Sequence, residues 1–448
     1  MKRVIIGGTH SGCGKTTVVC AVLAALKARG FAVSSFKCGP DYIDPMFHES
    51  IIGADAHNLD SFFCDDNTLR YLLCTNGEKS DISVIEGVMG YYDGVGGRGS
   101  AHSVSAATGT PSVIVIDCKG ASESIGAVVK GFLDYKRPNS IKGFIFNRLP
   151  ERLVPLAKDI CEESGTKYFG FFPVTSFSLE SRRLGLITAA EVADLKKITE
   201  QLGVLAEKHI LLDELMNTAE SPLPDFEPLK LNRLFENKHP KIAVAKDRAF
   251  CFIYSDNITL LEKLGCEIEF FSPMNDTKLP DNCCGIILCG GYPELYAAEL
   301  SSNSSMLAAI KSAAASGMPI IAECGGFMYL HDTMKMPDGS EYGMVGAIKG
   351  TAYETQRLQR FGYVTLTADA DNLICAKGES IPAHEFHYWD STDCGESFKA
   401  EKNDGRNWRC VHADKAMYAG FPHLYFYSDT GIAQRFAAAC AEFGGIYG

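Results

Sequence analysis

The first part of the chain alternates short apolar runs with longer helical patterns. Five runs have the length and composition of strands: Arg3–Gly7, Ala32–Phe36, Ile82–Glu86, Ser112–Asp117 and Lys142–Asn147. Nearly continuous apolar strands separated by helices are typical of a parallel sheet that is covered on both faces. We therefore expect an α/β domain with a doubly wound sheet, whose ligands gather at the carboxyl ends of the strands.

A second alternation follows a charged, helix-prone stretch whose prolines, in Ser221–Pro228, disfavour regular structure. Four further strands are predicted: Lys241–Ala245, Glu267–Phe271, Gly285–Cys289 and Pro319–Ala322. The pattern thus predicts an N-terminal domain over residues 1–190, a connection over 191–239, and a second doubly wound α/β domain over 240–448.

Composition supports a compact protein and narrows its partners. Of 448 residues, 46% are hydrophobic and 22% are charged, values that fit neither disorder nor a fibrous protein. The net charge of −12 disfavours broad binding to nucleic acid or to an anionic membrane. No apolar run approaches the ~18 residues that span a bilayer, so a cytoplasmic location is expected. The 17 cysteines lack the spacing of paired bridges, which favours reduced thiols.

A glycine-rich segment follows the first predicted strand and precedes a helical run, the context that a phosphate-binding loop requires. Its backbone N–H groups are expected to face phosphate oxygens, while Lys15 reaches the β- and γ-phosphates and the Thr16 hydroxyl ligates Mg²⁺. The strict phosphate-loop pattern would need glycine at position 9, where this chain has Thr9. The residues expected to bind ATP here are Thr9, Gly12, Gly14, Lys15, Thr16 and Thr17.

Acidic residues follow the second and third predicted strands, at the sheet edge that also carries the phosphate loop. Asp41 and Asp44 come after the second strand together with Lys37, and Glu86 ends the third. Phosphoryl transfer between two anions needs Mg²⁺ and a nearby cation, so this arrangement suits the activation of a carboxylate. The alternative is that Asp41 and Asp44 only cap turns beside Pro40 and Pro45.

The second domain contains a cysteine placed like a catalytic nucleophile. Cys324 follows an apolar strand and precedes Gly325-Gly326, so that a sharp turn would expose its sulfur. The backbone N–H groups of Gly291 and Gly325 are expected to form an oxyanion hole when a thiolate attacks a glutamine amide. His423 is the expected base.

These motifs closely resemble the cobyrinic acid a,c-diamide synthase family, over both domains. The segments that carry the resemblance are Lys37–Pro45, Glu86–Gly90, and Gly290–Glu294 together with Cys324. The resemblance implies a phosphate-loop domain similar to dethiobiotin synthetase and a class I glutamine amidotransferase domain. It also implies magnesium-site roles for Thr16, Asp41 and Glu86; contacts with the macrocycle for Tyr42, Asp44 and Asp93, with Lys37 among them; and an adenine contact for Asn147.

One position departs from ordinary class I amidotransferases, which carry a glutamate two residues after the catalytic histidine. Here that residue is Tyr425, a departure that the resembled family shares, so we expect a Cys324–His423 dyad without an orienting carboxylate. The segment Ala383–Trp389 has histidines three apart, but its alternating pattern predicts a strand with the two histidines on opposite faces, which does not suit a metal site.

The activity that the resemblance implies is the amidation of the a and c acetate carboxylates of cobyrinic acid in cobalamin biosynthesis. Glutamine, ATP with Mg²⁺, and a tetrapyrrole polycarboxylate would be the ligands. Hydrogenobyrinic acid and nickel-sirohydrochlorin stay open as alternative macrocycles, and a homodimer stays open as the assembly. An alternative of another class is a nucleotide switch similar to partition ATPases, with a degenerate glutaminase module.

Overall fold

The computed structural model describes residues 1–175, 189–231, 233–235 and 238–446. The chain divides into two compact units, Met1–Leu229 and Lys230–Gly448. The division lies inside the stretch that the sequence assigned to the connection.

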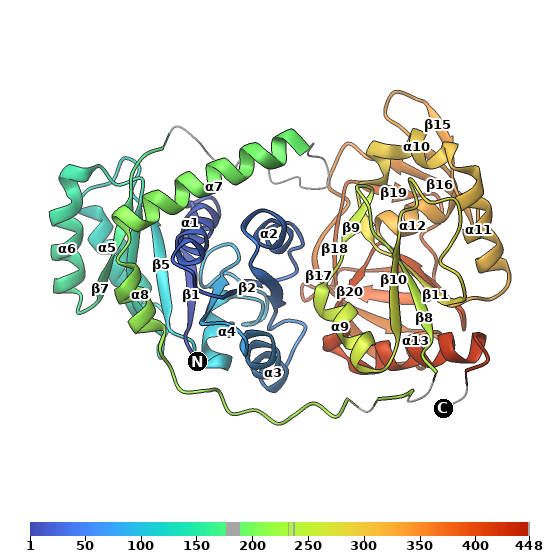
Figure 1. Ribbon diagram of the computed structural model, residues 1–448, viewed down its shortest axis with the longest axis horizontal. Helices are drawn as coiled ribbons and strands as arrows, with labels where there is room; N and C mark the ends of the chain where they lie inside the picture. The colour runs from blue at the N-terminus through green and yellow to red at the C-terminus, as the bar shows by residue number, and fades with distance from the viewer. Residues whose placement is uncertain (176–188, 232, 236–237, 447–448) are drawn as a thin grey trace. The chain divides into compact units, whose positions relative to one another are not determined.

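The described part of the first unit is built on a seven-stranded parallel sheet. In spatial order its strands are β3 (Asp55–Leu59), β2 (Val33–Cys38), β4 (Ile82–Glu86), β1 (Arg3–Gly8), β5 (Ser112–Asp117), β6 (Ile141–Asn147) and β7 (Lys167–Phe172). The order reverses at β1, because β4 and β2 lie on one side of it and β5 on the other (Figure 1). The phosphate loop therefore leaves the sheet at a topological switch point, where open α/β sheets bind ligands.

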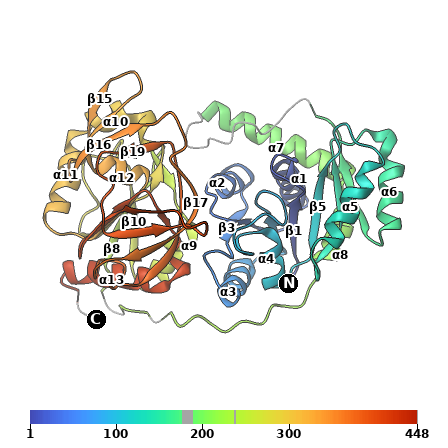
Figure 2. The same ribbon diagram turned by 180° about the vertical axis from the view of Figure 1, so that it is seen from behind.

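Helices cover this sheet and complete its core. They are α1 (Lys15–Ala28), α2 (Ile43–Phe47), α3 (Asp66–Gly77), α4 (Ala101–Thr108), α5 (Ser124–Asp134), α6 (Val154–Glu163), α7 (Ala189–His209) and α8 (Leu212–Ala219), with short turns η1 (His48–Ile52) and η2 (Glu151–Leu153). Helix α1 packs on β1, β2 and β4, and α7 lies along α1 (Figure 2). Apolar side chains of α1, α7 and α8 share one buried cluster with side chains of the strands, so α7 and α8 belong to the core of this unit.

The second unit contains a six-stranded, mostly parallel sheet. Its strands, in spatial order, are β10 (Glu267–Phe271), β8 (Lys241–Ala245), β11 (Cys283–Leu288), β13 (Ile320–Glu323), β23 (Met417–Gly420) and the antiparallel β22 (His412–Ala413). The described part of this unit contains five helices: α9 (Ser255–Lys263), α10 (Ala297–Ser302), α11 (Ser304–Ala315), α12 (Gly325–Leu330) and α13 (Thr430–Phe443), with the short turns η4 (Pro293–Tyr296) and η5 (Phe426–Ser428).

Three smaller sheets surround the main sheet of the second unit. One is antiparallel, in the order β21 (Asn407–Cys410), β20 (Phe398–Glu401), β17 (Arg360–Ala368), β18 (Ser380–His387) and β24 (His423–Leu424). Another contains β15 (Glu341–Gly343), β14 (His331–Lys335), β16 (Ile348–Glu354) and β19 (Trp389–Ser391), and the last pairs β12 (Gly290–Gly291) with β9 (Phe250–Phe252). Strand β24 matters most for function, because it holds His423 against β18.

The nine strands predicted from the sequence are confirmed, with shifts of one or two residues at some ends. Two strands of the first sheet, β3 and β7, were not predicted. Strand β3 reads Asp-Ala-His-Asn-Leu, and its polar side chains hide it from a search for apolar runs. The three smaller sheets were also missed, apart from the strand predicted at Ala383–Trp389, which corresponds to β18 and β19.

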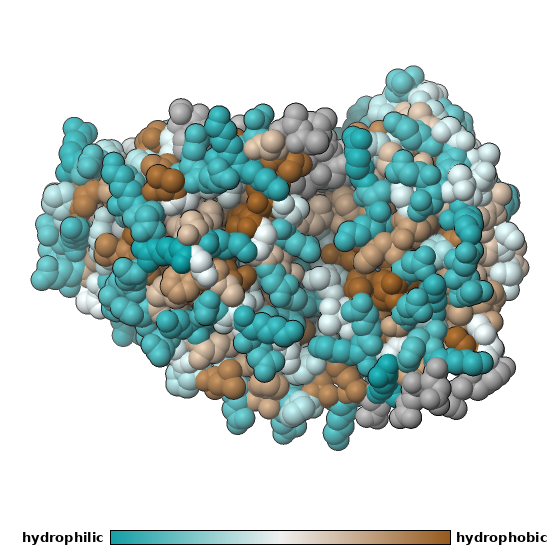
Figure 3. Space-filling view, in the orientation of Figure 1, coloured by the Kyte–Doolittle hydropathy of each residue, from teal (hydrophilic) through white to brown (hydrophobic). Residues whose placement is uncertain are grey.

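The surface of both units is largely hydrophilic on the face seen from the front (Figure 3). On the face seen in Figure 3, hydrophilic side chains cover much of each unit and hydrophobic ones form scattered patches. Within the described residues, no helix has the length and apolar character needed to cross a bilayer. Among the described residues, no disulfide bond joins two cysteines.

Candidate functional site

The phosphate loop runs from the end of β1 into α1, as predicted. Gly12 and Gly14 have φ angles of +81° and +88°, which glycine adopts without strain. Gly14 also has no room for a side chain, because a Cβ there would lie 2.0 Å from Nδ2 of Asn147. That amide donates a 2.9 Å hydrogen bond to the carbonyl of Cys13, so Asn147 supports the loop directly from the end of β6.

Four side chains of the loop and of the first turn of α1 were assigned to ATP. Lys15 is buried and its Nζ donates to the carbonyl of Met89 at 3.3 Å. Burial, together with the nearby Lys37 ammonium, lowers the pKa of Lys15. Thr16 is buried with its hydroxyl on Glu86, whereas Thr9 bonds to its neighbour His10 and Thr17 is half-buried.

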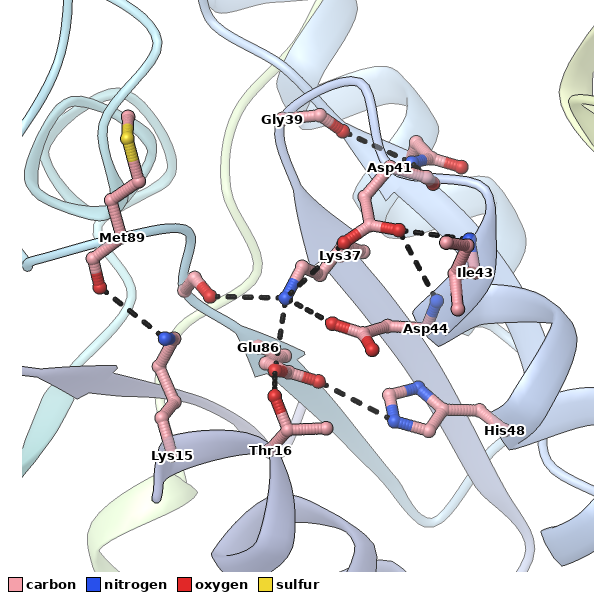
Figure 4. A network of polar contacts seen from close by, with 12 residues as sticks. Lys15, Thr16, Lys37, Gly39, Asp41, Ile43, Asp44, His48, Glu86 and Met89 are labelled. Atoms are coloured by element: carbon pink, nitrogen blue, oxygen red, sulfur yellow. Dashed lines mark hydrogen bonds and ion pairs between the residues drawn. The ribbon is translucent and has the colours of Figure 1, made fainter. Parts of the chain in front are cut away.

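Lys37 is the centre of the acidic cluster (Figure 4). Its buried Nζ lies 2.6 Å from Oδ2 of Asp44, 2.9 Å from Oε1 of Glu86 and 3.8 Å from Oδ2 of Asp41. The parallel pairing of β2 with β4 sets Lys37 opposite Glu86, which explains how the two side chains meet. Thr16 Oγ1 donates to the same Glu86 oxygen at 2.5 Å, and this contact joins the cluster to the phosphate loop.

The electrostatics of this cluster keep Lys37 charged. Burial alone would lower the pKa of Lys37, but the carboxylates of Asp44, Glu86 and Asp41 raise it, so the ammonium persists. Burial and the neighbouring Asp44 raise the pKa of Asp41. The chain thus places several carboxylates close together and offsets their charge with one lysine.

Asp41 also caps a turn, as the alternative reading of the sequence proposed. Its Oδ1 accepts hydrogen bonds from the backbone N–H groups of Ile43 and Asp44, at 2.8 and 3.2 Å. Asp44, in contrast, is buried, and its carboxylate accepts a hydrogen bond from Lys37. Tyr42 is buried at the start of α2, and Asp93 is exposed on the loop after β4, where it accepts from the Gly90 N–H.

His48 is a residue that the sequence analysis missed. It is fully buried, its Nδ1 lies 2.6 Å from the Ser35 hydroxyl, and its Nε2 lies 3.4 Å from Oε2 of Glu86 (Figure 4). The carboxylate of Glu86 is therefore flanked by His48 on one oxygen and by Thr16 and Lys37 on the other. No local motif marks His48, because it meets Glu86 only through the fold.

The oxygen ligands around Thr16 and Glu86 fit Mg²⁺ bound together with phosphates. Within the described residues, no group of three or more His, Cys, Asp or Glu side chains is arranged as a metal cage. Magnesium bound to a nucleotide does not need one, because it uses one or two protein oxygens and completes its shell with phosphates and water.

In the second unit, Cys324 lies in the sharp turn between β13 and α12. Its φ and ψ angles are 48° and −102°, an unusual conformation for a residue other than glycine and a mark of a strained functional turn. The chain can approach this turn closely because of its glycines. A Cβ on Gly325 would lie 3.1 Å from the backbone nitrogen of Gly291, so the two predicted oxyanion-hole residues are neighbours.

His423 lies beside Cys324, as predicted, at the start of β24. It is 3% exposed, and Gly290 packs so closely that a Cβ there would lie 2.6 Å from Cε1 of the imidazole. Burial by itself lowers the pKa of His423, but hydrogen bonds with Cys324 and Glu323 outweigh burial and raise it to about 10. The imidazolium of His423 is therefore held beside the sulfur of Cys324, the arrangement of a Cys–His centre.

The expectation that His423 lacks a neighbouring carboxylate is wrong. Oε2 of Glu323 lies 3.3 Å from Nδ1 of His423, and Oε1 accepts the backbone N–H of Leu424 at 3.2 Å. Position 425, where ordinary class I enzymes carry the acid, holds Tyr425 as expected from the sequence. Its hydroxyl donates a hydrogen bond to Asp256 at 2.9 Å. The neighbouring carboxylate belongs instead to the residue before Cys324, at the end of β13, which pairs with β23 a few residues ahead of His423.

Asn257 was also missed by the sequence analysis. Its side chain donates to the carbonyl of Leu424 at 2.9 Å and accepts from the N–H of Phe426 at 2.7 Å, so it fixes the backbone after His423. On the other side of β24, His423 pairs with His384 of β18. Along β18, His387 is buried and stacks on Phe421, with ring centroids 4.0 Å apart.

Comparisons with known proteins agree with this division. Residues 4–182 match the CobQ/CobB/MinD/ParA nucleotide binding domain, and residues 241–431 match the CobB/CobQ-like glutamine amidotransferase domain. The chain is 38% identical to the cobyrinate a,c-diamide synthase of Caldanaerobacter subterraneus subsp. tengcongensis, with 98% of each chain covered. It is 37% identical to that of Listeria innocua, covering 98% of this chain and 99% of the relative.

Similarity to solved structures extends over a smaller share of the chain. The septum site-determining protein MinD of Pyrococcus horikoshii covers 49% of this chain, at 18% identity and a TM-score of 0.32. The full-length relatives, by contrast, span both units at more than a third identity. The chain therefore belongs to the CobB/CobQ family of glutamine amidotransferase ligases, which includes these cobyrinate a,c-diamide synthases.

Proposed function

We propose that this protein uses ATP and glutamine to amidate the a and c acetate carboxylates of cobyrinic acid in cobalamin biosynthesis. The names of its full-length relatives support this substrate. The observation that carries the proposal is the presence of two different reactive centres in one chain. One joins a phosphate loop to a lysine-bound carboxylate cluster, and the other pairs Cys324 with His423.

The first centre activates the carboxylate. Lys15 and the loop N–H groups bind the phosphates of ATP, with Thr9, Gly12, Gly14 and Thr17 shaping the loop. Thr16, Glu86 and Asp41 would hold Mg²⁺, which when bound offsets charge on the transferring phosphoryl group. Asn147 contacts the adenine in this proposal while keeping its bond to the loop.

The acceptor carboxylate binds beside Lys37, with Tyr42, Asp44 and Asp93 facing the macrocycle. An oxygen of the acetate side chain attacks the γ-phosphorus of ATP, ADP leaves, and an acyl phosphate forms. Ammonia then adds to the acyl carbon, the carbon–oxygen bond to phosphate breaks, and inorganic phosphate leaves with the amide as product. Two such rounds give the a,c-diamide.

The second centre supplies the ammonia. The Cys324 thiolate attacks the amide carbon of glutamine, and the Gly291 and Gly325 N–H groups stabilise the oxyanion. His423 gives a proton to the leaving ammonia, because its raised pKa keeps it protonated. Water then hydrolyses the thioester, which releases glutamate and restores the thiolate.

The test is an assay of the purified protein with ATP, Mg²⁺, glutamine and each of three macrocycles: cobyrinic acid, hydrogenobyrinic acid and nickel-sirohydrochlorin. We expect diamide, ADP and phosphate with cobyrinic acid. With carboxylate-labelled [¹⁸O]cobyrinic acid, one labelled oxygen should enter each released phosphate. If another macrocycle is amidated faster, that macrocycle replaces cobyrinic acid as the proposed substrate. If none of the three gives a product, the proposal is refuted.

A nucleotide switch of the partition-ATPase kind predicts different results, namely dimerisation that depends on ATP and no glutamine hydrolysis. Sedimentation with ADP and with ATP, run beside a glutaminase assay, separates the two functions. We further propose that the enzyme works in the cytoplasm as a homodimer. A sedimentation coefficient that corresponds to one chain, with either nucleotide, would overturn the homodimer.

A further inference from the structure

Glu323 occupies a position that sequence motifs do not assign to catalysis. It is a buried carboxylate, 6% exposed, on the last residue of β13 and directly before the nucleophile Cys324. One of its oxygens faces Nδ1 of His423 at 3.3 Å and the other accepts the Leu424 N–H at 3.2 Å. It therefore contacts both the imidazole and the backbone that carries it.

The turn at Cys324 explains how neighbouring residues reach one imidazole. Successive side chains of a regular strand point to opposite faces, so residues 323 and 324 would normally diverge. The Cys324 N–H still bonds to the carbonyl of Gly420 at 2.8 Å, as the parallel pairing of β13 with β23 requires, but the positive φ of Cys324, 48°, ends the strand at this residue. With Nδ1 facing Glu323, Nε2 is the nitrogen left to face the sulfur.

The position that usually carries the orienting acid is used for something else. Tyr425 is fully buried, and its hydroxyl donates to Asp256 on α9. Its ring packs edge-on against Tyr254, with centroids 5.0 Å apart. Tyr425 thus anchors β24 to α9 and leaves the Nδ1 side of His423 to Glu323.

We infer that Glu323 is a positioning residue of the glutaminase reaction and takes the place of the acid that class I enzymes carry two residues after the histidine. By accepting a hydrogen bond from Nδ1–H of His423, it fixes the orientation of the ring, directs Nε2 at Cys324 and stabilises the imidazolium. This inference rests on the proposed function, because it assigns a role within glutamine hydrolysis.

The charged groups around His423 agree with this role. Glu323 of β13 and Cys324 at the start of α12 both face the ring, and His384 of β18 is its cross-strand neighbour. Burial, with the nearby His423, lowers the pKa of His384, so that His384 stays neutral at physiological pH. Glu323 is thus the anionic partner that remains for the imidazolium after the thiolate has formed its thioester.

The variant Glu323→Gln tests the role, because glutamine keeps the size of the side chain and an oxygen for the Leu424 N–H but removes the charge. We expect kcat for glutamine hydrolysis to fall about 10²-fold, while product formation from added ammonia stays within about twofold. The alkaline limb of the kcat/KM profile should move to lower pH. Glu323→Asp should recover part of the rate, because it restores the charge. Glu379→Gln is the matched control, since Glu379 pairs with Arg435 at 2.7 Å elsewhere in this unit.

A second readout does not depend on turnover. The rate at which iodoacetamide alkylates Cys324 at pH 7, followed by mass spectrometry of its peptide, should fall about tenfold in Glu323→Gln and stay unchanged in Glu379→Gln. Unchanged alkylation together with an unchanged alkaline limb would overturn the role of Glu323. If the unaltered protein makes no diamide, the proposed function fails, but the alkylation result still decides the role of Glu323.

Discussion

The two units place their reactive groups at the same kind of location but hold them by different means, charge in the first and close packing in the second. In both, the groups follow strands of a parallel sheet, near the phosphate loop in one and in the turn before α12 in the other. The first centre gathers carboxylates around the Lys37 ammonium. The second has a sulfur, an imidazole and one carboxylate, held by a strained turn and by glycines without room for a side chain.

This difference follows from the chemistry that each centre performs. Phosphoryl transfer brings highly charged ligands together, so the protein supplies charges and donors and leaves room for ATP and Mg²⁺. Attack on an amide needs few groups, but each must be aimed within a fraction of an ångström. The first centre should therefore be sensitive to charge, and the second to geometry.

The largest effect expected is that of Cys324→Ala. It removes the nucleophile, so amidation from glutamine should fall at least about 10³-fold, as measured by diamide formation. Amidation from ammonia should stay within about twofold, because the first unit is untouched. An equal loss with both nitrogen donors would remove the distinction between the two centres.

The next effect concerns Glu86→Gln, which removes the buried carboxylate that Thr16, Lys37 and His48 surround. Amidation should fall about 10²-fold with glutamine and with ammonia alike, since carboxylate activation precedes both. A titration of the rate with Mg²⁺ should show a higher half-saturating concentration. An unchanged half-saturating Mg²⁺ concentration would show that Glu86 does not belong to the metal site.

A smaller effect is expected for Gly290→Ala, because the new methyl group would displace the imidazole of His423. Glutamine hydrolysis should fall about tenfold, and amidation from ammonia should be unaffected. Gly131→Ala is the control, because a Cβ there meets nothing within 4 Å. If both variants behave alike, close packing against His423 does not limit the second centre.

The smallest effect near neutral pH is a pH dependence of the second centre alone. The pKa of His423 is raised to about 10, so the imidazolium is present below that pH and is lost above it. The kcat/KM for glutamine hydrolysis should therefore fall as the pH rises through about 10. A profile that falls near the ordinary histidine value of ~6.5 would contradict the hydrogen bonds to Cys324 and Glu323.

The sequence predicted what depends on local pattern. Strands β8 and β10 agree with their predicted ends, because each is a short run bounded by clear breaks. The phosphate loop and the turn at Cys324 could also be predicted, since glycine and the nucleophile are adjacent in sequence. In contrast, β3 contains His57 and Asn58, and the apolar pattern gave no sign of a buried strand.

Contacts between distant residues could not be predicted in this way. His48 of η1 contacts Ser35 of β2, and β2 lies beside β4, which carries Glu86. Asn257 reaches β24 from α9. Glu323 is the clearest case. Its sequence position suggested only the end of a strand, and its contact with His423 depends on the pairing of β13 with β23 and on the unusual φ of Cys324.

The division of labour is tested most directly by one ratio, the rate of diamide formation with glutamine divided by the rate with ammonia, in two variants. Cys324→Ala should lower the ratio at least about 10³-fold, whereas Glu86→Gln should leave it unchanged while lowering both rates. Equal ratios in the two variants would contradict the account of two centres with separate tasks.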